Sequence, residues 1–246
     1  MKNKVLPSIL LFTFISCSES FDIDVSFGES QSINPGIDDA FASTYKPMNS
    51  EPILFKSANI YDGLGGELKD YDLLLSDGKI IEIGKSLTAA EALIIDATNK
   101  WLTPGIIDIH SHMGVYSAPG VSTSSDGNEA TSPVTAEVWA EHSLWTQDPQ
   151  FALALKGGVT AFHVLPGSAN LFGGRGATFK NISQNTIQAM KFPGAPHSLK
   201  MACGENPKRV YGSRGQSPAT RMGNMAGYRS TWIDAVEYTD GMNAEN

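Results

Sequence analysis

The pattern of apolar and polar positions divides the chain into four parts. An apolar run from Val5 to Ile15 follows two lysines and is shorter than the roughly 20 apolar residues that a membrane-spanning helix needs. Residues 18–52 are acidic, rich in Ser, Pro and Gly, and lack a sustained hydrophobic period, which predicts a flexible tether. Residues 53–103 contain short strand-like runs, whereas strand-like and helix-like segments alternate over residues 104–246.

Residues 53–103 are predicted to form a small, β-sandwich-like unit. The stretch YDLLLSDGKIIEIG places two apolar runs on either side of Asp77-Gly78, a dipeptide that favours a two-residue hairpin turn. The runs ILFKSANIY and ALIID are typical of further strands. The unit is small, so we expect it to accompany the larger part of the chain.

Residues 104–246 are predicted to be α/β. The stretches GIIDIHSH, VTAFHVLPG and HSLKMACGENP are typical of strands, and TAEVWAEHSLWTQDPQFALALKGG is typical of a helix that a Gly-Gly pair ends. Strands that alternate with helices indicate a parallel sheet. The stretch SANLFGGRGATFKN is predicted to be a glycine-rich loop that could include a short strand.

Two histidines, His110 and His112, end the strand GIIDIHSH. Residues i and i+2 of a strand point to the same face, so the two imidazoles are expected to project in one direction. Two converging imidazoles form half of a site for a divalent transition metal, although one histidine could instead be packed and the other solvated. Asp108, two residues earlier, could orient a ligating imidazole or pack deeper in the fold.

The N-terminus has the layout of a secretory signal. In MKNKVLPSILLFTFISCSES, lysines precede an apolar run and small residues follow it. Cys17 stands where a bacterial lipoprotein signal has its lipidated cysteine, so residues 1–17 are predicted to be a lipoprotein-type signal peptide. We expect an exported protein that a lipid on Cys17 anchors to a membrane, periplasmic or outer-membrane-anchored. An ordinary cleaved signal with an incidental cysteine is the alternative.

Composition narrows the class of protein further. The chain has 246 residues, 41% hydrophobic and 18% charged, which is an ordinary globular composition. Its formal net charge is −8, and no basic cluster stands out, so nucleic-acid binding is not expected. Cys203 is the one other cysteine, so a lipidated Cys17 leaves no intramolecular disulfide. Nothing in the sequence indicates an oligomeric state.

Three elements, DGKIIEIG, LTPGIIDIHSHMG and GVTAFHVLPGS, in that order and spacing, resemble the amidohydrolase superfamily. The resemblance is closest to its imidazolonepropionase-like branch of secreted or periplasmic metal hydrolases and runs from about Ile53 to the end of the chain. It implies a TIM-type (β/α)8 barrel preceded by a small β unit. It also implies hydrolysis of a carbon–nitrogen bond in a small-molecule amide, lactam or similar substrate by metal-activated water, because a zinc-type ion lowers the pKa of water to about 7.

The same resemblance implies a ligand set. His110 and His112 would be the first two ligands of one or two divalent ions, zinc above all. A further ligand is implied from the third or fourth strand, either a glutamate or a carboxylated lysine, and SLKMACGENPKRVYG offers Lys200 and Glu205. Glu205 is preferred because it follows the strand end, where barrels carry their chemistry, with Lys200 as the alternative. Both also have structural interpretations, a solvated lysine and a helix-start acid.

Two further residues are assigned to the substrate pocket or its wall. His163 lies on the second strand, where the family has no expected ligand, so it is interpreted as a pocket or core histidine. Arg175 lies in FGGRGA, which is predicted to be a tight loop near the pocket mouth, and it is a candidate contact for a substrate anion. This loop lacks the Gly-Lys-Ser/Thr ending of a phosphate-binding loop.

A complete (β/α)8 barrel takes ~250 residues, more than residues 104–246 provide. We therefore expect the chain to be the N-terminal half of an amidohydrolase, inactive alone, with its catalytic base beyond Asn246. Two other functions stay open. One is a non-catalytic surface or binding lipoprotein on the same scaffold, since fold alone does not establish function; the other is a lyase or isomerase.

Overall fold

The computed structural model describes residues 41–245. The predicted signal peptide, its lipidation site Cys17 and most of the predicted tether therefore lie outside the described residues. Within the described part, no helix is both long enough and apolar enough to cross a membrane.

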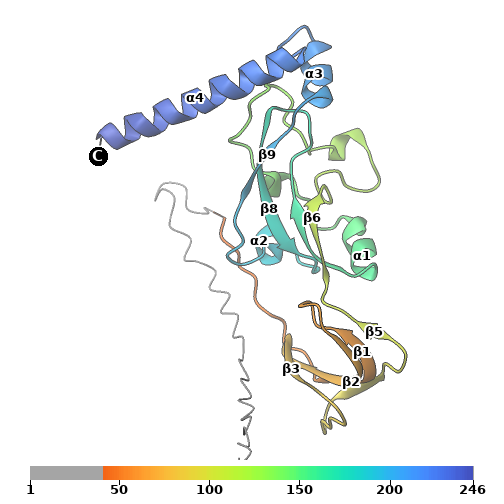
Figure 1. The fold of residues 1–246 in the computed structure, drawn as a ribbon. Helices are drawn as coiled ribbons and strands as arrows, with labels where there is room; N and C mark the ends of the chain where they lie inside the picture. The colour runs from red at the N-terminus through yellow and green to blue at the C-terminus, as the bar shows by residue number, and fades with distance from the viewer. Residues whose placement is uncertain (1–40, 246) are drawn as a thin grey trace, which may run out of the picture. The chain divides into compact units, whose positions relative to one another are not determined.

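The first sheet is built from the region predicted to be all-β (Figure 1). Its strands are paired in the order β3-β2-β1-β4, and β5 pairs with β1; they are β1 (Ile53–Tyr61), β2 (Glu67–Ser76), β3 (Lys79–Gly84), β4 (Leu93–Asp96) and β5 (Trp101–Leu102). The unit is thus one sheet rather than two packed sheets. Asp77 and Gly78 both have positive φ, 49° and 71°, as a type I′ turn requires, so the predicted hairpin is confirmed.

The second sheet holds the two-histidine strand. Its order is β6-β7-β8-β9, formed by β6 (Ile106–Ser111), β7 (Val159–Val164), β8 (Phe172–Lys180) and β9 (Ser198–Met201). Strands β6 and β7 are parallel, as expected, and helix α1 (Pro149–Lys156) lies between them in sequence. Strand β8 runs antiparallel to both β7 and β9, so the expectation of a wholly parallel sheet is wrong.

Strand β8 is the glycine-rich stretch that was predicted to be a loop with at most a short strand, and it is a strand of nine residues. Its glycines let neighbouring groups approach the backbone closely. A Cβ on Gly176 would lie 2.8 Å from His163 Nε2 and 2.6 Å from Ser198 Oγ, and a Cβ on Gly174 would lie 2.4 Å from the Val138 carbonyl oxygen. The glycines in this stretch therefore reflect close packing across a strand rather than a turn.

The predicted long helix is two shorter elements. A 3-10 helix, η2 (Ala140–Ser143), comes first, and α1 begins afresh at Pro149. Proline has no N–H to donate and fits the first helical position, and the Asp148 side chain caps this start by accepting a hydrogen bond from the Gln150 N–H. A helix that ran through residue 149 would lack one backbone hydrogen bond there, because proline has no N–H to donate.

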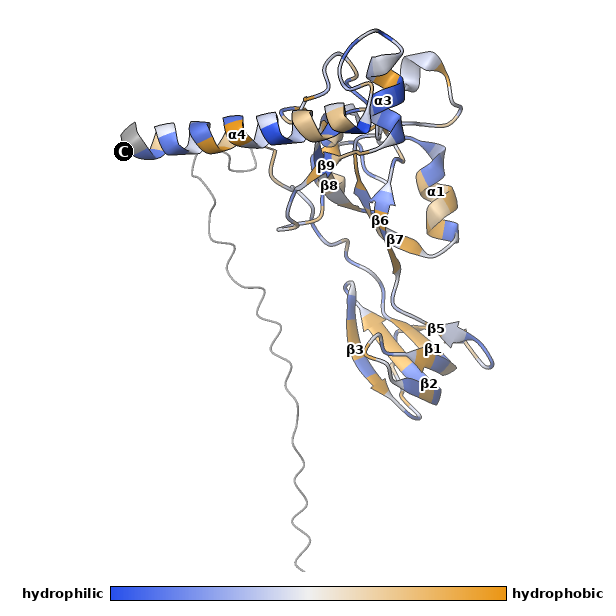
Figure 2. Ribbon diagram, turned by 45° about the horizontal axis from the view of Figure 1, so that its top comes forward, coloured by the Kyte–Doolittle hydropathy of each residue, from blue (hydrophilic) through white to orange (hydrophobic). Residues whose placement is uncertain are grey.

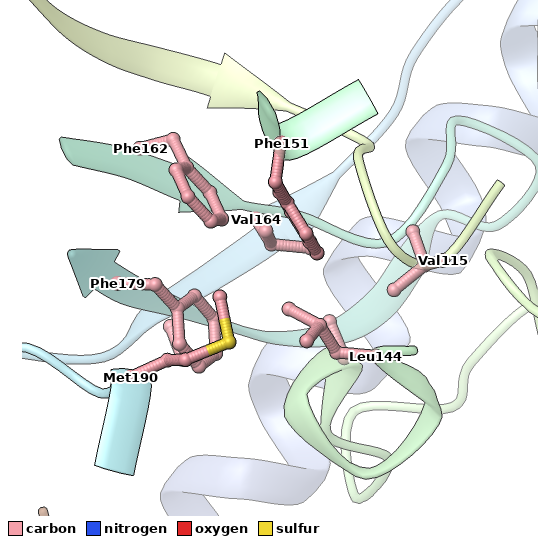
Figure 3. Packing of buried hydrophobic residues seen from close by; sticks show 9 residues of the cluster. Val115, Leu144, Phe151, Phe162, Val164, Phe179 and Met190 are labelled. Atoms are coloured by element: carbon pink, nitrogen blue, oxygen red, sulfur yellow. The ribbon is translucent and has the colours of Figure 1, made fainter. Parts of the chain in front are cut away.

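The main core lies between α1, the second sheet and the loops that join them. Figure 3 shows its side chains pointing toward one another: Val115, Leu144, Phe151, Phe162, Val164, Phe179 and Met190. The ring of Phe162 stacks on Phe151 with centroids 5.1 Å apart and on Phe179 with centroids 5.8 Å apart. This core packs β7 and β8 against α1, and Val115, in the turn after β6, packs in the same core, so the core holds the chain just after the histidine pair.

Two short helices lie between strands of the second sheet in sequence, η1 (Ser122–Ser124) after β6 and α2 (Ile187–Met190) after β8. Helices α3 (Glu205–Gly212) and α4 (Arg221–Glu245) follow β9. Figure 2 shows apolar residues concentrated on β1 to β3, whereas α4 alternates between apolar and polar residues along its length. Tyr228 and Trp232 of α4 contact the ring of Phe172 edge-on.

The last part of the predicted tether is held in place. Ser43 Oγ donates a hydrogen bond to the Lys191 carbonyl at 2.6 Å, and the Thr44 N–H donates to the Gln188 carbonyl at 3.0 Å. Lys191 Nζ donates to the Phe41 carbonyl and forms a buried ion pair with Glu141 at 2.7 Å. The flexible tether predicted for residues 18–52 therefore does not describe residues 41–44.

Candidate metal centre

The histidine pair lies where strand β6 ends. The rings of His110 and His112 are adjacent, with centroids 5.3 Å apart and planes at 90°. The chain then turns sharply, because the His112 carbonyl accepts hydrogen bonds from the N–H groups of Val115 and Tyr116. The structure thus brings the two predicted ligands together at a strand end that a turn closes.

One nitrogen of His112 is already engaged. Its Nδ1 lies 2.8 Å from the Leu165 carbonyl oxygen. A carbonyl oxygen can only accept a hydrogen bond, so Nδ1 carries a proton, and in the neutral ring Nε2 then keeps its lone pair. Backbone carbonyls commonly orient metal-binding histidines in this way. His112 therefore presents Nε2 as the nitrogen that can bind a metal.

Lys200 joins the pair from strand β9. Its Nζ lies 3.4 Å from His110 Nε2, and the residue is only 8% exposed. Burial lowers the pKa of Lys200. Burial also lowers the pKa of His110, with the charges of Lys200 and His112 acting in the same direction and the carboxylate of Asp108 opposing them. Both groups are thereby shifted toward the uncharged forms, which have lone pairs to donate.

Glu205, the preferred third ligand, lies elsewhere. It begins helix α3, is exposed, and forms an ion pair with Arg209 Nε at 2.9 Å. Among residues 41–245, no three His, Cys, Asp or Glu side chains are grouped so that they could hold a metal ion. Gly204, with φ of 74°, turns the chain into α3 directly after the strand. The geometry therefore supports Lys200, the alternative, rather than Glu205.

The Asp108 side chain bonds to the backbone of His110 and not to an imidazole ring. Its Oδ1 accepts a hydrogen bond from the His110 backbone N–H at 3.0 Å. Of the two roles considered for Asp108, orienting a ring and packing deeper, neither describes this contact. The carboxylate instead fixes the backbone at the end of β6.

His163 is held by hydrogen bonds on both ring nitrogens. Its Nδ1 lies 2.8 Å from Thr178 Oγ1 and its Nε2 lies 2.6 Å from Ser198 Oγ. Burial lowers the pKa of His163, and the charges of His197 and His110 lower it further. With both nitrogens engaged, His163 has the surroundings of a packed histidine and offers no free lone pair to a metal.

Arg175 lies on strand β8 and not in a loop. Its guanidinium lies over the ring of Trp139, 4.6 Å from the centroid, which is a cation–π contact. Its backbone N–H donates to the Val138 carbonyl at 2.7 Å. The predicted role as a substrate-anion contact stays a prediction, because a guanidinium stacked on an aromatic face keeps its N–H donors.

A cleft of about 310 Å³ has walls that include Asp126, Asn128, Glu129, Trp139, His142 and Gly173. A Cβ on Gly173 would lie 3.7 Å from Lys200 Cγ. The side chain of Asn128 donates a hydrogen bond to the Tyr116 hydroxyl, and the Tyr116 ring lies edge-on to His112 with centroids 5.7 Å apart. Two residues of the cleft wall, Gly173 and Asn128, thus adjoin Lys200 and Tyr116, and the Tyr116 ring in turn contacts His112.

Tyr116 and Asn128 were not identified from the sequence. Tyr116 follows His112 by four residues, and its N–H closes the turn after that histidine. This closeness in sequence was the one available signal for Tyr116. Asn128 carried no such signal, because it is 12 residues from Tyr116 in the sequence and only the folding of the intervening loop brings the two side chains together.

Comparisons with known proteins agree on the class of protein. No family model matches the chain. Amidohydrolase tasK of Hapsidospora irregularis is 38% identical over 179 residues, which cover 68% of this chain and 18% of that protein. A dihydroorotase of Caldanaerobacter subterraneus subsp. tengcongensis is 39% identical over 61 residues, 25% of this chain and 14% of that enzyme.

A solved structure is similar over a larger part of the chain. An amidohydrolase from Thermotoga maritima superposes with a TM-score of 0.71 and 41% identity over 78% of this chain and 49% of that one. Together these homologues and this structure support the amidohydrolase superfamily and a mixed α/β fold for the chain. The chain spans less than a fifth of each of these curated relatives and about half of the solved structure.

Proposed function

We propose that this chain provides the two-histidine metal centre of a metal-dependent hydrolase that acts on carbon–nitrogen bonds of a small molecule. Homologues named amidohydrolase and dihydroorotase support a hydrolase of this class. The observation that carries the proposal is the position of Lys200 Nζ, 3.4 Å from His110 Nε2, beside a His112 whose Nε2 is free. The second sheet would be part of a TIM-type barrel.

The residues present fit a zinc-type ion. Imidazole nitrogens suit zinc, and His110 and His112 offer two of them. The third group, Lys200, is buried and its pKa is lowered, so its amine can react with CO2. The Nζ lone pair would attack the carbon, one C=O electron pair would move to oxygen, and a proton would leave the nitrogen for water. The resulting carbamate would give Lys200 oxygen atoms that could help to hold the ion.

The bound ion would supply an activated water at neutral pH, and the chain's own residues would do the rest. His112 would keep its Nε2 directed through the Nδ1 hydrogen bond to Leu165, and Asp108 would hold the strand end through the His110 N–H. The substrate would lie in the cleft whose wall includes Asn128 and Gly173, which adjoin Tyr116 and Lys200. The Asp108 carboxylate is engaged by the His110 backbone N–H, and we propose that the proton-shuttling base comes from outside the described residues.

Two wider proposals follow from the sequence. The arrangement of Lys2, Lys4 and the apolar run before Cys17 supports export and a lipid anchor on that cysteine. A non-catalytic lipoprotein on the same scaffold is the alternative function, and zinc-dependent turnover by the assembled enzyme separates the two.

The metal centre is tested by measuring the zinc content of the full chain and of His110→Ala and His112→Ala. We expect each substitution to remove most bound zinc, because it removes one of the imidazole ligands. His142→Ala is the matched control, since His142 is an exposed histidine on η2, and it should retain zinc. Full zinc occupancy in both His110→Ala and His112→Ala would refute the proposed centre.

A further inference from the structure

The turn that follows His112 is attached to a buried carboxylate. Asp148 is 2% exposed. Its Oδ2 accepts a hydrogen bond from the Gly114 N–H at 2.8 Å, and its Oδ1 accepts one from the Ala118 N–H at 3.3 Å. Tyr116, whose ring contacts His112, lies between these two attachment points. One side chain therefore fixes both sides of the turn.

The same carboxylate caps helix α1. Its Oδ1 accepts from the Gln150 N–H at 3.0 Å, and its Oδ2 accepts from Gln150 Nε2 at 2.9 Å. Gln150 Nε2 also donates to the Tyr116 carbonyl at 2.9 Å. Each oxygen of Asp148 thus accepts from two donors, which an amide side chain could not reproduce because its NH2 group only donates.

Gly114 is held at every point that its backbone offers. Its N–H bonds to Asp148, and its carbonyl accepts from the Trp145 N–H at 2.9 Å. Its φ is 82°, and a Cβ there would lie 2.8 Å from Leu144 Cγ and 2.9 Å from Phe151 Cζ. A residue fixed in this way, two positions after His112, leaves the turn little freedom to rotate.

We propose that Asp148 is a positioning residue for the candidate metal centre. By holding Gly114 and Ala118, it sets the turn after His112 and so keeps the His112 ring where Nδ1 meets the Leu165 carbonyl. Nε2 then carries the free lone pair. This proposal concerns the orientation of the His112 ring. It rests on the proposed function only where it predicts an effect on metal binding.

The substitution Asp148→Ser separates the two roles of this side chain. A serine hydroxyl can still cap α1 by accepting from the Gln150 N–H, but it has no second oxygen for Gly114. The readout is the tautomer of the His112 ring in the metal-free full chain, measured by 15N NMR and assigned with His112→Gln. We expect one tautomer, protonated on Nδ1, in the unsubstituted chain and a mixture of tautomers in Asp148→Ser.

The matched control is Thr186→Ala, which removes the cap of another helix. Thr186 Oγ1 accepts from the Ala189 N–H at 3.3 Å at the start of α2. Its loss should leave the His112 tautomer unchanged. If Asp148→Ser does not fold, Asp148→Asn keeps one oxygen that can cap α1 by accepting from the Gln150 N–H, but its NH2 group cannot accept from the Gly114 N–H, so it should also give a mixture of tautomers.

Zinc affinity gives a second measurement. Residues that orient a metal ligand typically change affinity by about 10- to 100-fold when they are substituted, so Asp148→Ser should bind zinc at least about 10-fold more weakly than the unsubstituted chain. A folded Asp148→Ser with an unchanged His112 tautomer would overturn the inference. Absence of zinc binding by the unsubstituted chain would instead refute the proposed function, since the tautomer is measured without metal.

Discussion

At the scale of single residues, the chemistry of the site depends on which nitrogen atoms keep a lone pair. The Leu165 carbonyl leaves Nε2 of His112 free, whereas Thr178 and Ser198 engage both nitrogens of His163. The pairing of His110 with His112 could be predicted from the sequence, because residues two positions apart on one strand point to the same face. The partners of His163 could not, because they come from strands β8 and β9.

Lys200 shows the limit of residue-level prediction. Position after a strand favoured Glu205, but the turn at Gly204 carries Glu205 into α3 while Lys200 stays on β9. The two residues are five apart, and their relation to His110 depends on the register between β8 and β9, in which Gly174 pairs with Lys200. Hydrophobic pattern alone does not set that register.

Asp72 provides a prediction at this scale. It is 3% exposed and accepts hydrogen bonds from the Ser57 N–H, the Leu87 N–H and Lys56 Nζ. Burial alone would raise the pKa of Asp72, but these hydrogen bonds outweigh it and hold the pKa below its ordinary value. Folding therefore favours the ionised form. The stability it contributes is fully present above about pH 4 and is lost as the pH falls through the folded-state pKa.

Asp72→Asn should therefore lower the free energy of unfolding near neutral pH by about 1–3 kcal/mol. The difference between the two proteins should shrink in acid, because the unsubstituted protein then loses the contribution that the variant lacks. Urea unfolding near pH 7 and near pH 3 measures both effects. Asp70→Asn, an exposed neighbour on β2, is the control. An equal loss at both pH values would contradict the assignment.

At the scale of elements, strand β8 differs most from what its sequence predicts. Glycine-rich stretches usually form turns, and local propensity gave no reason to expect a nine-residue strand from Phe172 to Lys180. Tertiary packing supplies the reason, because β8 pairs with β7 on one side and β9 on the other. The β2–β3 hairpin was predictable by contrast, since its turn chemistry is carried by Asp77 and Gly78 alone.

Gly176→Ala tests this account of β8. The added methyl would meet His163 Nε2 and Ser198 Oγ at less than 3 Å, and overpacking of this kind typically costs about 1–3 kcal/mol. We expect thermal unfolding at a lower temperature than for the unsubstituted protein. Gly120→Ala is the control, because nothing lies within 4 Å of a Cβ there. Equal melting temperatures for the two variants would contradict close packing at Gly176.

At the scale of the whole molecule, the described residues form the part of the fold that carries the histidine pair. Strands β6 and β9 are the two edges of the second sheet, and Ile107 and Ile109 of β6 are 64% and 77% exposed. The solved amidohydrolase that superposes on this chain extends over about twice the matched length. The fold class was predictable from alternating patterns, whereas the antiparallel β8 required the three-dimensional pairing.

The proposed anchor is also a whole-molecule prediction. If Cys17 is lipidated, mass spectrometry of the membrane fraction of expressing cells should find an acylated peptide that begins at Cys17. Cys17→Ser should release the protein from the membrane fraction, because the Cys17 thiol is the proposed attachment site of the lipid. An unmodified N-terminal peptide that begins at another residue would refute the lipid anchor.

The central claim is that His110, His112 and Lys200 form one metal centre, and zinc affinity of the full chain tests it most directly. Chelator competition would compare the unsubstituted chain with Lys200→Ala and Glu205→Gln, in the presence of CO2. We predict that Lys200→Ala weakens zinc binding at least about 10-fold, because Lys200 lies 3.4 Å from His110 Nε2, and that Glu205→Gln leaves it unchanged, because Glu205 pairs with Arg209. Unchanged affinity in Lys200→Ala, or a larger loss in Glu205→Gln, would contradict this assignment.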